Sequence, residues 1–393
     1  MTEIFGDEGP ALPEPRRSRT YPVTEYDEHQ EKLRKQARWS LKDVPGYRGK
    51  GKPQDPLAWH DVDYLDVYQK VYGRRCGSAG IGKLREVAIV APGPDDEYSN
   101  HPYFHEDKEY MNRDGFFLLS DKLDIAKLKD EAAAFGAKFE ENGVKVHWLH
   151  FPEKPMAAYG PMMNMHSAAE LMVVPGGGII GKKSYALSPT AGYGRTEYFA
   201  RWALWNLGIP VLFTVTGEAC WVMGNWLADD VFINGIGIEG DWRGLEQVAP
   251  VLRRACGEDL RIVSCVAPSW KYFDKHTGAN THAGMVVSGL DVNKVLVHTP
   301  GVDFNTMAWL KRNGYRIIEA DLEEMIKHSA AAIVSLGPGI VMMHARAKKT
   351  IAAVRKAGVE VVPIDYDEYN KYGAAITCAT MLLNRDPGPK KFS

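Results

Sequence analysis

The sequence lacks the features that define several large protein classes. Its 393 residues contain five cysteines, an odd number with no CxxC pair, which argues against a disulfide framework and a structural zinc site. No apolar run is long enough to cross a bilayer, and Met1 is followed by acidic, proline-rich sequence rather than a signal peptide. The formal net charge of -2 gives no basic footprint. We therefore expect a cytoplasmic protein with no nucleic-acid or membrane partner.

The first part of the chain differs from the rest. Residues 1–24 are rich in Pro, Arg and Glu, which predicts an arm that is disordered or docked on a partner subunit. A polar helix with a thin apolar stripe is predicted over Glu25–Ser40. A second helix is predicted over Asp61–Tyr72, where apolar residues recur at near-helical spacing. We therefore divide the chain into an N-terminal arm and helical extension, residues 1–84, and a main domain, residues 85–393, and expect a homo-oligomer.

The main domain contains an internal repeat. Five times the sequence gives an amphipathic helix pattern, a glycine where a helix C-cap wants a left-handed residue, and a short apolar strand. Two further apolar strands separated by a turn precede most of these helices: Leu171–Pro175 with Gly178–Gly181, Cys220–Met223 with Asp230–Gly235, Ala283–Ser288 with Lys294–His298, and Ala331–Ser335 with Gly339–His344. Units of this kind cannot bury their faces alone, so five of them predict an α/β ring around a central axis.

One cysteine stands in a distinctive context near the end of the chain. Cys378 follows a run of small residues and precedes the apolar run Ala379–Leu383. Small residues let backbone and substrate approach the sulfur, and the apolar run predicts a buried strand that holds it. The pattern favours a nucleophile, although free cysteine is also among the most buried residue types, so a packed core thiol is the alternative.

Taken together, these features resemble the pentein fold, a five-bladed α/β propeller with pseudo-fivefold symmetry. The chain is similar over residues 85–386 to the guanidino-group-modifying superfamily of deiminases, dimethylarginine hydrolases and amidinotransferases. Three pieces carry the resemblance: Cys378, His282 at the start of a strand pair, and Glu218 in Gly217–Trp221. It implies a nucleophile at Cys378, a general acid/base at His282, an orienting carboxylate at Glu218, and no cofactor or metal. The residues alone leave open a core histidine and a turn carboxylate.

The sequence also departs from the pattern of the arginine-type members. They place an aspartate two residues after the histidine, where this chain has Gly284, and another at the position of Trp221. A third acid aligns only loosely, with Glu170. Because a buried guanidinium cation needs paired carboxylates, their loss favours a neutral substrate. We expect Gly284, Glu170 and Trp221 to contact it, the last by stacking on a flat ring, unless Trp221 is a core residue.

The sequence thus predicts a cofactor-independent hydrolase whose thiolate attacks a planar carbon between nitrogens. Among the substrates of the family, the resemblance favours a small neutral heterocycle such as 2-nitroimidazole: nitrite would leave, and His282 would activate the water that releases the imidazolone from the covalent adduct. The alternative is an arginine- or agmatine-type deiminase, or an amidinotransferase. A binding module without catalysis is a further possibility. An oxidoreductase would rest only on the glycine pattern Gly235–Gly240, which we interpret as a strand end and turn.

Overall fold

The computed structural model describes residues 42, 46–55, 57–58, 76–92, 124–150, 171–182, 196–237, 240–266, 283–371 and 375–392. The chain forms two compact units, Met1–Gly73 and Arg74–Ser393. The second unit therefore begins before residue 85, where the sequence placed the boundary. The predicted helices Glu25–Ser40 and Asp61–Tyr72 lie outside the described residues.

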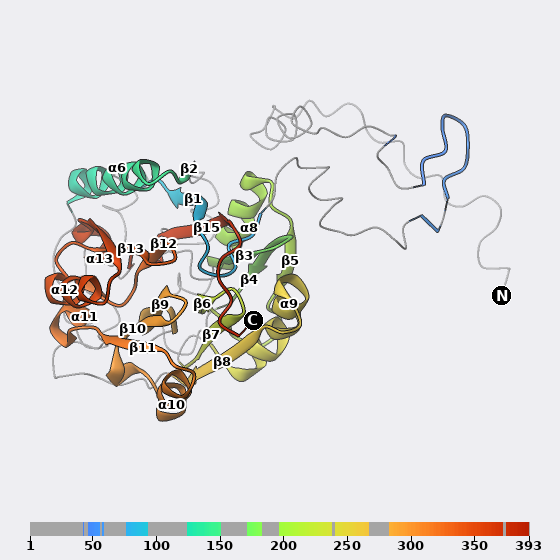
Figure 1. The fold of residues 1–393 in the computed structure, drawn as a ribbon. Helices are drawn as coiled ribbons and strands as arrows, with labels where there is room; N and C mark the ends of the chain where they lie inside the picture. The colour runs from blue at the N-terminus through green and yellow to red at the C-terminus, as the bar shows by residue number, and fades with distance from the viewer. Residues whose placement is uncertain are drawn as a thin grey trace. The chain divides into compact units, whose positions relative to one another are not determined.

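The described residues of the second unit form five three-stranded sheets (Figure 1). In chain order the first four sheets are β3 (Leu171–Val174), β4 (Gly177–Ile180) and β5 (Val211–Thr214); β6 (Asn225–Ala228), β7 (Val231–Ile236) and β8 (Arg261–Val266); β9 (Val287–Asp291), β10 (Lys294–Val297) and β11 (Arg316–Glu319); and β12 (Val334–Gly337), β13 (Ile340–His344) and β14 (Glu360–Ile364). The fifth sheet joins β15 (Thr380–Arg385) to β1 (Leu84–Val90) and β2 (Lys145–Leu149).

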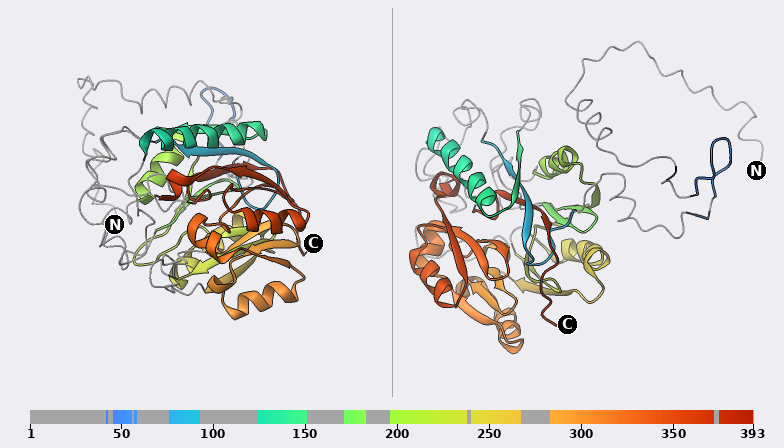
Figure 2. Two further views of the ribbon diagram at one scale, coloured as in Figure 1. Left: turned by 90° about the vertical axis from the view of Figure 1, so that its left-hand side faces the viewer. Right: turned by 45° about the horizontal axis from the view of Figure 1, so that its top comes forward.

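All five sheets share one strand plan. The middle strand pairs antiparallel with one neighbour and parallel with the other. A parallel neighbour needs a crossover, and a helix supplies it in each sheet. These crossover helices are α6 (Ile125–Glu141), α8 (Thr196–Leu207), α9 (Trp242–Cys256), α10 (Phe304–Arg312) and α12 (Lys348–Lys356). They lie on the outer side of the sheets (Figure 2).

The predicted glycine turns are confirmed. The glycine after each crossover helix has a positive φ, between 64° and 119°, which L side chains rarely adopt. These glycines are Gly143, Gly208, Gly257, Gly314 and Gly358. The pattern Gly235–Gly240 is not a dinucleotide-binding turn, because β7 ends at Ile236 and α9 begins only at Trp242, after the motif. The prediction of a strand end and turn is confirmed.

Three predicted strands are displaced, and the one predicted at Ala331–Ser335 begins only at Val334, as β12. Residues Cys220–Met223 form no strand, because Trp221 makes an isolated bridge with Lys182 and the strand starts later, as β6. Residues Ala283–Met285 form the 3₁₀ turn η4 instead of extended backbone, since the Val286 N–H bonds to the Ala283 carbonyl at 3.0 Å. The apolar patterns located the strand pairs but not the turns that precede them.

Aspartates fix the starts of several helices. Asp124, Asp241 and Asp303 are the N-caps of α6, α9 and α10, and each side chain accepts a backbone N–H of the first turn. Asp321 does the same for α11 (Leu322–His328). Such caps satisfy backbone N–H groups that the helix itself leaves unpaired, so these helices begin at defined residues.

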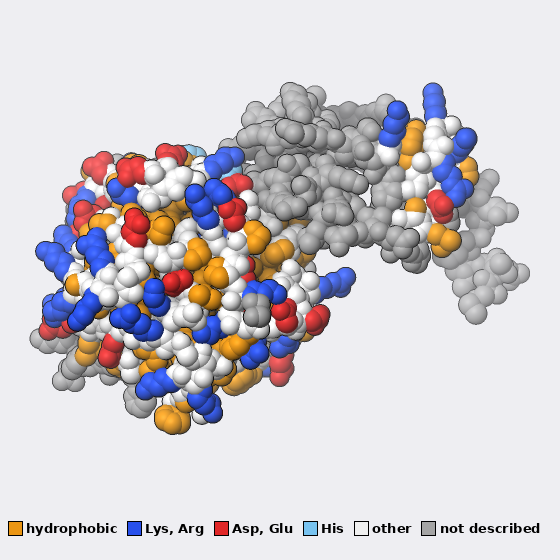
Figure 3. Space-filling view, viewed as in Figure 1, with side chains coloured by type: hydrophobic (Ala, Val, Ile, Leu, Met, Phe, Trp, Pro, Cys, Tyr) orange, Lys and Arg blue, Asp and Glu red, His pale blue; other side chains and the backbone are white. Residues whose placement is uncertain are grey.

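The sheets are also neighbours of one another. Strand β15 lies beside β3, β6 lies beside β9, and β12 lies beside both β9 and β1, while α9 packs against β3 and β5. On the face drawn in Figure 3, acidic and basic side chains of the described residues are interspersed. Among the helices of the described residues, none has the length and apolar character to span a membrane.

Candidate active site

Cys378 lies in a tight turn directly before β15. The turn Ile376–Ala379 is closed by hydrogen bonds from the Cys378 N–H to the Ala375 carbonyl, 2.8 Å, and from the Thr380 hydroxyl to the Ile376 carbonyl, 2.7 Å. The predicted buried strand after the cysteine is confirmed as β15, whose register with β1 fixes the turn. The side chain of Cys378 is 5% exposed.

The apolar side chains that cluster with Cys378 in the described residues are mostly small. Cys378 clusters with Ala332 and Ala375, and Met285 packs against this group. The small side chains allow the turn to approach the start of β12 closely. A neutral, flat reactant would lose little hydration free energy on reaching such a place, whereas a cation would lose much.

The predicted acid/base residue, His282, lies outside the described residues. The residues that directly follow it, from Ala283 onward, are described. Turn η4 (Ala283–Met285) follows directly, Gly284 within it is buried, and Met285 packs against the cluster that contains Cys378. The described chain from Ala283 onward therefore contacts the surroundings of the cysteine through Met285. The role of His282 stays a prediction.

Glu218 lies at the surface of the described structure. Its side chain is 91% exposed in the turn before Trp221 and forms an ion pair with Arg243, 3.3 Å between Oε2 and Nη1. Its catalytic role stays a prediction. A catalytic carboxylate must come within hydrogen-bond reach of a reacting group or of the residue that it orients. The contacts of Glu218 in the described residues instead match the turn carboxylate that the sequence left as the alternative.

Trp221 is a core residue. It has no exposed surface, and its Nε1–H donates to Asn234 Oδ1 at 2.7 Å. The ring packs in a cluster with residues of β3, β6 and β7, including Phe232. The prediction that Trp221 stacks on a substrate ring is therefore replaced by its alternative. Glu170, the remaining predicted contact, lies outside the described residues.

Replacing Trp221 with phenylalanine tests this assignment. We expect a loss of about 2 kcal/mol in unfolding free energy, because Asn234 Oδ1 would lose its donor and a void would remain beside it. The KM should stay unchanged, since the ring touches no substrate. Denaturant unfolding and steady-state kinetics measure both quantities. Trp242→Phe, at a tryptophan that is 51% exposed, is the matched control. A raised KM at unchanged stability would restore the stacking role.

Two buried carboxylates, which the sequence analysis missed, position the segment that carries Cys378. Glu131 of α6 accepts backbone N–H groups of Asp367, Glu368 and Tyr369 at the start of α13 (Asp367–Lys371), at 3.1, 2.7 and 3.4 Å. Glu368 in turn accepts the Asp124 N–H at the start of α6, 3.0 Å. Each helix therefore caps the other, and α13 is held in place shortly before the cysteine. The sequence did carry a signal, an acid on the apolar face of α6.

Tyr366 is a further missed neighbour of the cysteine. It is fully buried and stacks on Tyr369 with ring centroids 4.7 Å apart. Burial raises the pKa of Tyr366 well above its ordinary value, and charge interactions with Tyr369 and Cys378 act in the same direction. Its phenol is therefore neutral and lies within the electrostatic field of the Cys378 sulfur.

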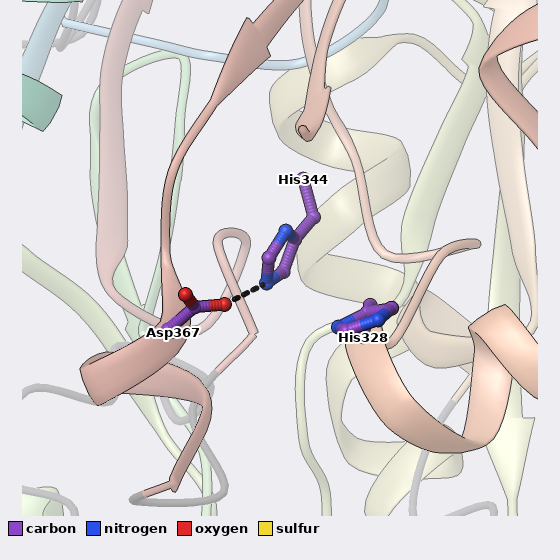
Figure 4. A group of neighbouring side chains, drawn as sticks. All are labelled: His328, His344 and Asp367. Atoms are coloured by element: carbon purple, nitrogen blue, oxygen red, sulfur yellow. Dashed lines mark ion pairs between the residues drawn. The ribbon is translucent and has the colours of Figure 1, made fainter. Parts of the chain in front are cut away.

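One group of side chains has the composition of a metal site. His328, His344 and Asp367 place their ligand atoms within 4.8 Å of one another, and His344 Nε2 lies 3.5 Å from Asp367 Oδ1 (Figure 4). The Arg346 N–H donates to His344 Nδ1 at 3.3 Å, so the ring proton belongs on Nε2, the nitrogen that faces the carboxylate. A metal at Nε2 would require the opposite tautomer. Arg346 also pairs with Asp367. The group therefore fits a hydrogen-bonded histidine better than a metal ligand set.

His344 makes stability sensitive to acid. Burial lowers its pKa from 6.5 to about 4, and the neighbouring charge of His328 lowers it too. At pH values between the folded pKa of about 4 and the ordinary pKa of 6.5, the unfolded chain binds the proton and the folded protein does not. The unfolding free energy therefore decreases as the pH falls through this range. From pH 7 to pH 5 we expect His344 to remove about 2 kcal/mol of unfolding free energy.

The variant His344→Asn keeps an acceptor for the Arg346 N–H but does not titrate. Its unfolding free energy should therefore change less between pH 7 and pH 5 than that of the wild type, as measured by urea unfolding at each pH. His150→Asn, at an exposed histidine, serves as the control. Equal pH dependence in wild type and His344→Asn would contradict the expectation.

Comparisons with known proteins were made for the whole chain. A 2-nitroimidazole nitrohydrolase from Mycobacterium sp. (strain JS330) is 32% identical over 363 residues, which cover 89% of this chain and 93% of that protein. A dimethylarginine dimethylaminohydrolase from Pseudomonas aeruginosa has a TM-score of 0.52 at 15% identity, covering 76% of this chain and 99% of the other. An amidinotransferase from Microseira wollei, of the saxitoxin biosynthetic pathway, has a TM-score of 0.54 at 15% identity over 81% and 99%. No protein-family model matches the chain.

Proposed function

The chain belongs to the pentein superfamily of guanidino-group-modifying enzymes, and from this premise we propose that it is a C–N bond hydrolase that removes nitrite from 2-nitroimidazole or a close neutral analogue. The proposal rests on one observation: a relative that shares 32% of residues over 89% of the chain is a 2-nitroimidazole nitrohydrolase. The buried Cys378 on its closed turn is the candidate nucleophile for this reaction.

The reaction proceeds in two steps. The Cys378 thiolate adds to the ring carbon between the two nitrogens, a carbon–sulfur bond forms, and nitrite leaves with the electron pair of the carbon–nitrogen bond. A water molecule then attacks the same carbon, His282 takes one of its protons, and the thiolate is released. The sum is 2-nitroimidazole and water giving imidazolone, nitrite and a proton. Nitrite is a weak base and needs no proton to depart, so the histidine acts mainly in the second step.

The apolar side chains that cluster with Cys378 and the residue at position 221 support a neutral substrate. The described side chains that cluster with Cys378 are Ala332, Ala375 and Met285, none of which can neutralise a cation. The position of Trp221, where the arginine-type pattern has an acid, is filled by a buried indole. A buried guanidinium requires paired carboxylates, and position 221 of the described structure supplies none.

Product analysis tests the proposal against a deiminase or amidinotransferase. The purified protein is incubated with 2-nitroimidazole, arginine and agmatine, and nitrite, ammonia and transferred amidino groups are measured. We expect nitrite from 2-nitroimidazole, and a covalent intermediate on the peptide that contains Cys378 in quenched samples analysed by mass spectrometry. Ammonia or a ureido product from a guanidine, with no nitrite, would favour the alternative.

We also propose that the five sheets are related by pseudo-fivefold symmetry as blades of one propeller, and that the chain forms a homo-oligomer. The shared strand plan and the side-by-side strands of neighbouring sheets support the symmetry. A crystal structure tests both points. Sheets that do not superpose by successive equal rotations about one axis would contradict the first.

A further inference from the structure

The chain continues past β15 as a C-terminal tail, residues 386–392, which runs from the end of that strand to the region of β7 and β8 (Figure 1). The structure describes all of these residues, and none of them belongs to a helix or strand or is fully buried. Pro387 and Pro389 have no backbone N–H, so they cannot donate to a strand ladder. Contacts other than strand pairing therefore hold the tail in place.

Two aspartates in the turn between β6 and β7 bind the backbone of the tail. Asp229 Oδ2 accepts the Gly388 N–H at 2.5 Å. Asp230 accepts the Lys391 N–H through Oδ1 at 2.6 Å and the Phe392 N–H through Oδ2 at 2.8 Å. Hydrogen bonds to a carboxylate are stronger than those between neutral groups, so these two side chains are the main polar anchor of the tail.

Asp229 also holds the beginning of the second unit. Its Oδ1 accepts the Ile81 N–H at 3.2 Å, and its own N–H donates to the Pro389 carbonyl at 3.1 Å. The Asp386 N–H donates to the Lys83 carbonyl at 2.9 Å. Three parts of the chain that are far apart in sequence therefore meet here: the residues before β1, the β6–β7 turn and the tail.

Phe392 is the apolar anchor of the tail. The Arg261 guanidinium carbon, from β8, lies 3.7 Å from the centre of the Phe392 ring, and the Trp309 ring, from α10, approaches it edge-on with centroids 6.2 Å apart. A guanidinium over an aromatic face is a favourable contact. Phe392 also packs against the apolar cluster that the second and third sheets share. The tail therefore connects the end of the fifth sheet to elements of the second and third.

We propose that residues 386–392 form a clasp, which opens and closes as one unit while the five sheets stay assembled. In the closed state the clasp fastens the end of β15 to the β6–β7 turn. Two neighbouring carboxylates and one aromatic ring hold all of it, so its contacts form and break together. By contrast, β15 pairs with β1 and contains buried side chains such as Met381 and Leu383. Segments with few buried contacts open at a lower free-energy cost than core strands.

Hydrogen exchange of the full-length protein tests the clasp, with fragmentation in the mass spectrometer to resolve single amides. The Gly388, Lys391 and Phe392 amides are compared with those of β15, in buffer and in low urea. We expect the tail amides to be protected and to depend little on urea, because opening the tail exposes little surface. Exchange in β15 should accelerate with urea. Tail amides that exchange as fast as an unstructured peptide, or with the urea dependence of β15, would overturn the proposal.

Two variants test whether the tail opens as one unit. Phe392→Ala removes the ring, and Asp230→Ala removes the acceptor of the Lys391 and Phe392 amides. Both variants should accelerate exchange of the Gly388 amide at least about tenfold, although its acceptor is Asp229, and should leave the β15 amides unchanged. Where Asp230→Ala prevents folding, Phe392→Ala alone decides.

Asp259→Ala is the matched control. Asp259 pairs with Lys390 of the same tail at 2.9 Å, but both side chains are exposed, at 63% and 45%. Such a surface pair contributes little, so exchange at Gly388 should change less than about twofold. Unchanged exchange at Gly388 in Phe392→Ala would show that the tail residues open independently. Equal acceleration in β15 would show that tail and strand unfold together, and either result would contradict the clasp.

Discussion

Replacing Cys378 with alanine is expected to abolish nitrite release, lowering kcat by at least about 10³-fold. The covalent step needs a nucleophile on this turn, and alanine offers none. The fold should survive, because the substitution removes one atom from a cluster of small side chains and costs about 1 kcal/mol of unfolding free energy. Nitrite release and denaturant unfolding, measured on the same preparation, give both values.

Cys265 provides the matched control for this experiment. It is also fully buried, and burial raises the pKa of its thiol to about 12, so it cannot supply a thiolate near neutral pH. The variant Cys265→Ala should therefore keep the kcat of the wild type. Retained nitrite release in Cys378→Ala would end the assignment of the nucleophile and revive the core-thiol alternative. Equal loss of activity in both variants would point to a general effect of cavities in the core.

Replacing Glu131 with alanine is expected to cost about 3–5 kcal/mol of unfolding free energy. Three backbone N–H groups at the start of α13 would lose their acceptor in a buried place, and Lys127 would lose a partner 3.6 Å away. Because α13 leads into the turn of Cys378, the kcat should fall as well, even in the fraction that stays folded. Urea unfolding and active-site titration separate these two effects.

Glu131→Gln refines this expectation. The amide keeps one acceptor oxygen, so its loss of stability should be smaller than that of the alanine variant. Glu140→Ala, at an exposed glutamate of the same helix, should change the unfolding free energy by less than about 0.5 kcal/mol. Similar stability in Glu131→Ala and Glu140→Ala would show that the contacts with α13 contribute little.

Much of the fold was predictable because it repeats. A glycine after a helix and before an apolar strand predicts a residue of positive φ that ends the helix, and this pattern at five positions identified five crossover units. The buried strand after Cys378 was predictable for a similar reason, since an apolar run at the end of the last unit must enter the core. These elements depend on residues that are close together in the chain, so the sequence alone was enough to predict them.

The site was predicted less completely, because it depends on contacts between distant residues. A tryptophan at position 221 reads equally well as a substrate platform or as a core residue, and only its bond with Asn234 distinguishes the two. The partner of Glu218 is Arg243, which no local pattern joins to it.

The pairing of β15 with β1 has a consequence for how the protein is made. Strands β1 and β15 stand at opposite ends of the described second unit, and Arg85 hydrogen-bonds to Asp386 across 301 positions. Contacts of such sequence separation form slowly. During synthesis the fifth sheet cannot be completed until β15, which ends at Arg385, has left the ribosome. A chain that stops before β15 would therefore leave β1 without its antiparallel partner, even though nearly every residue had been translated.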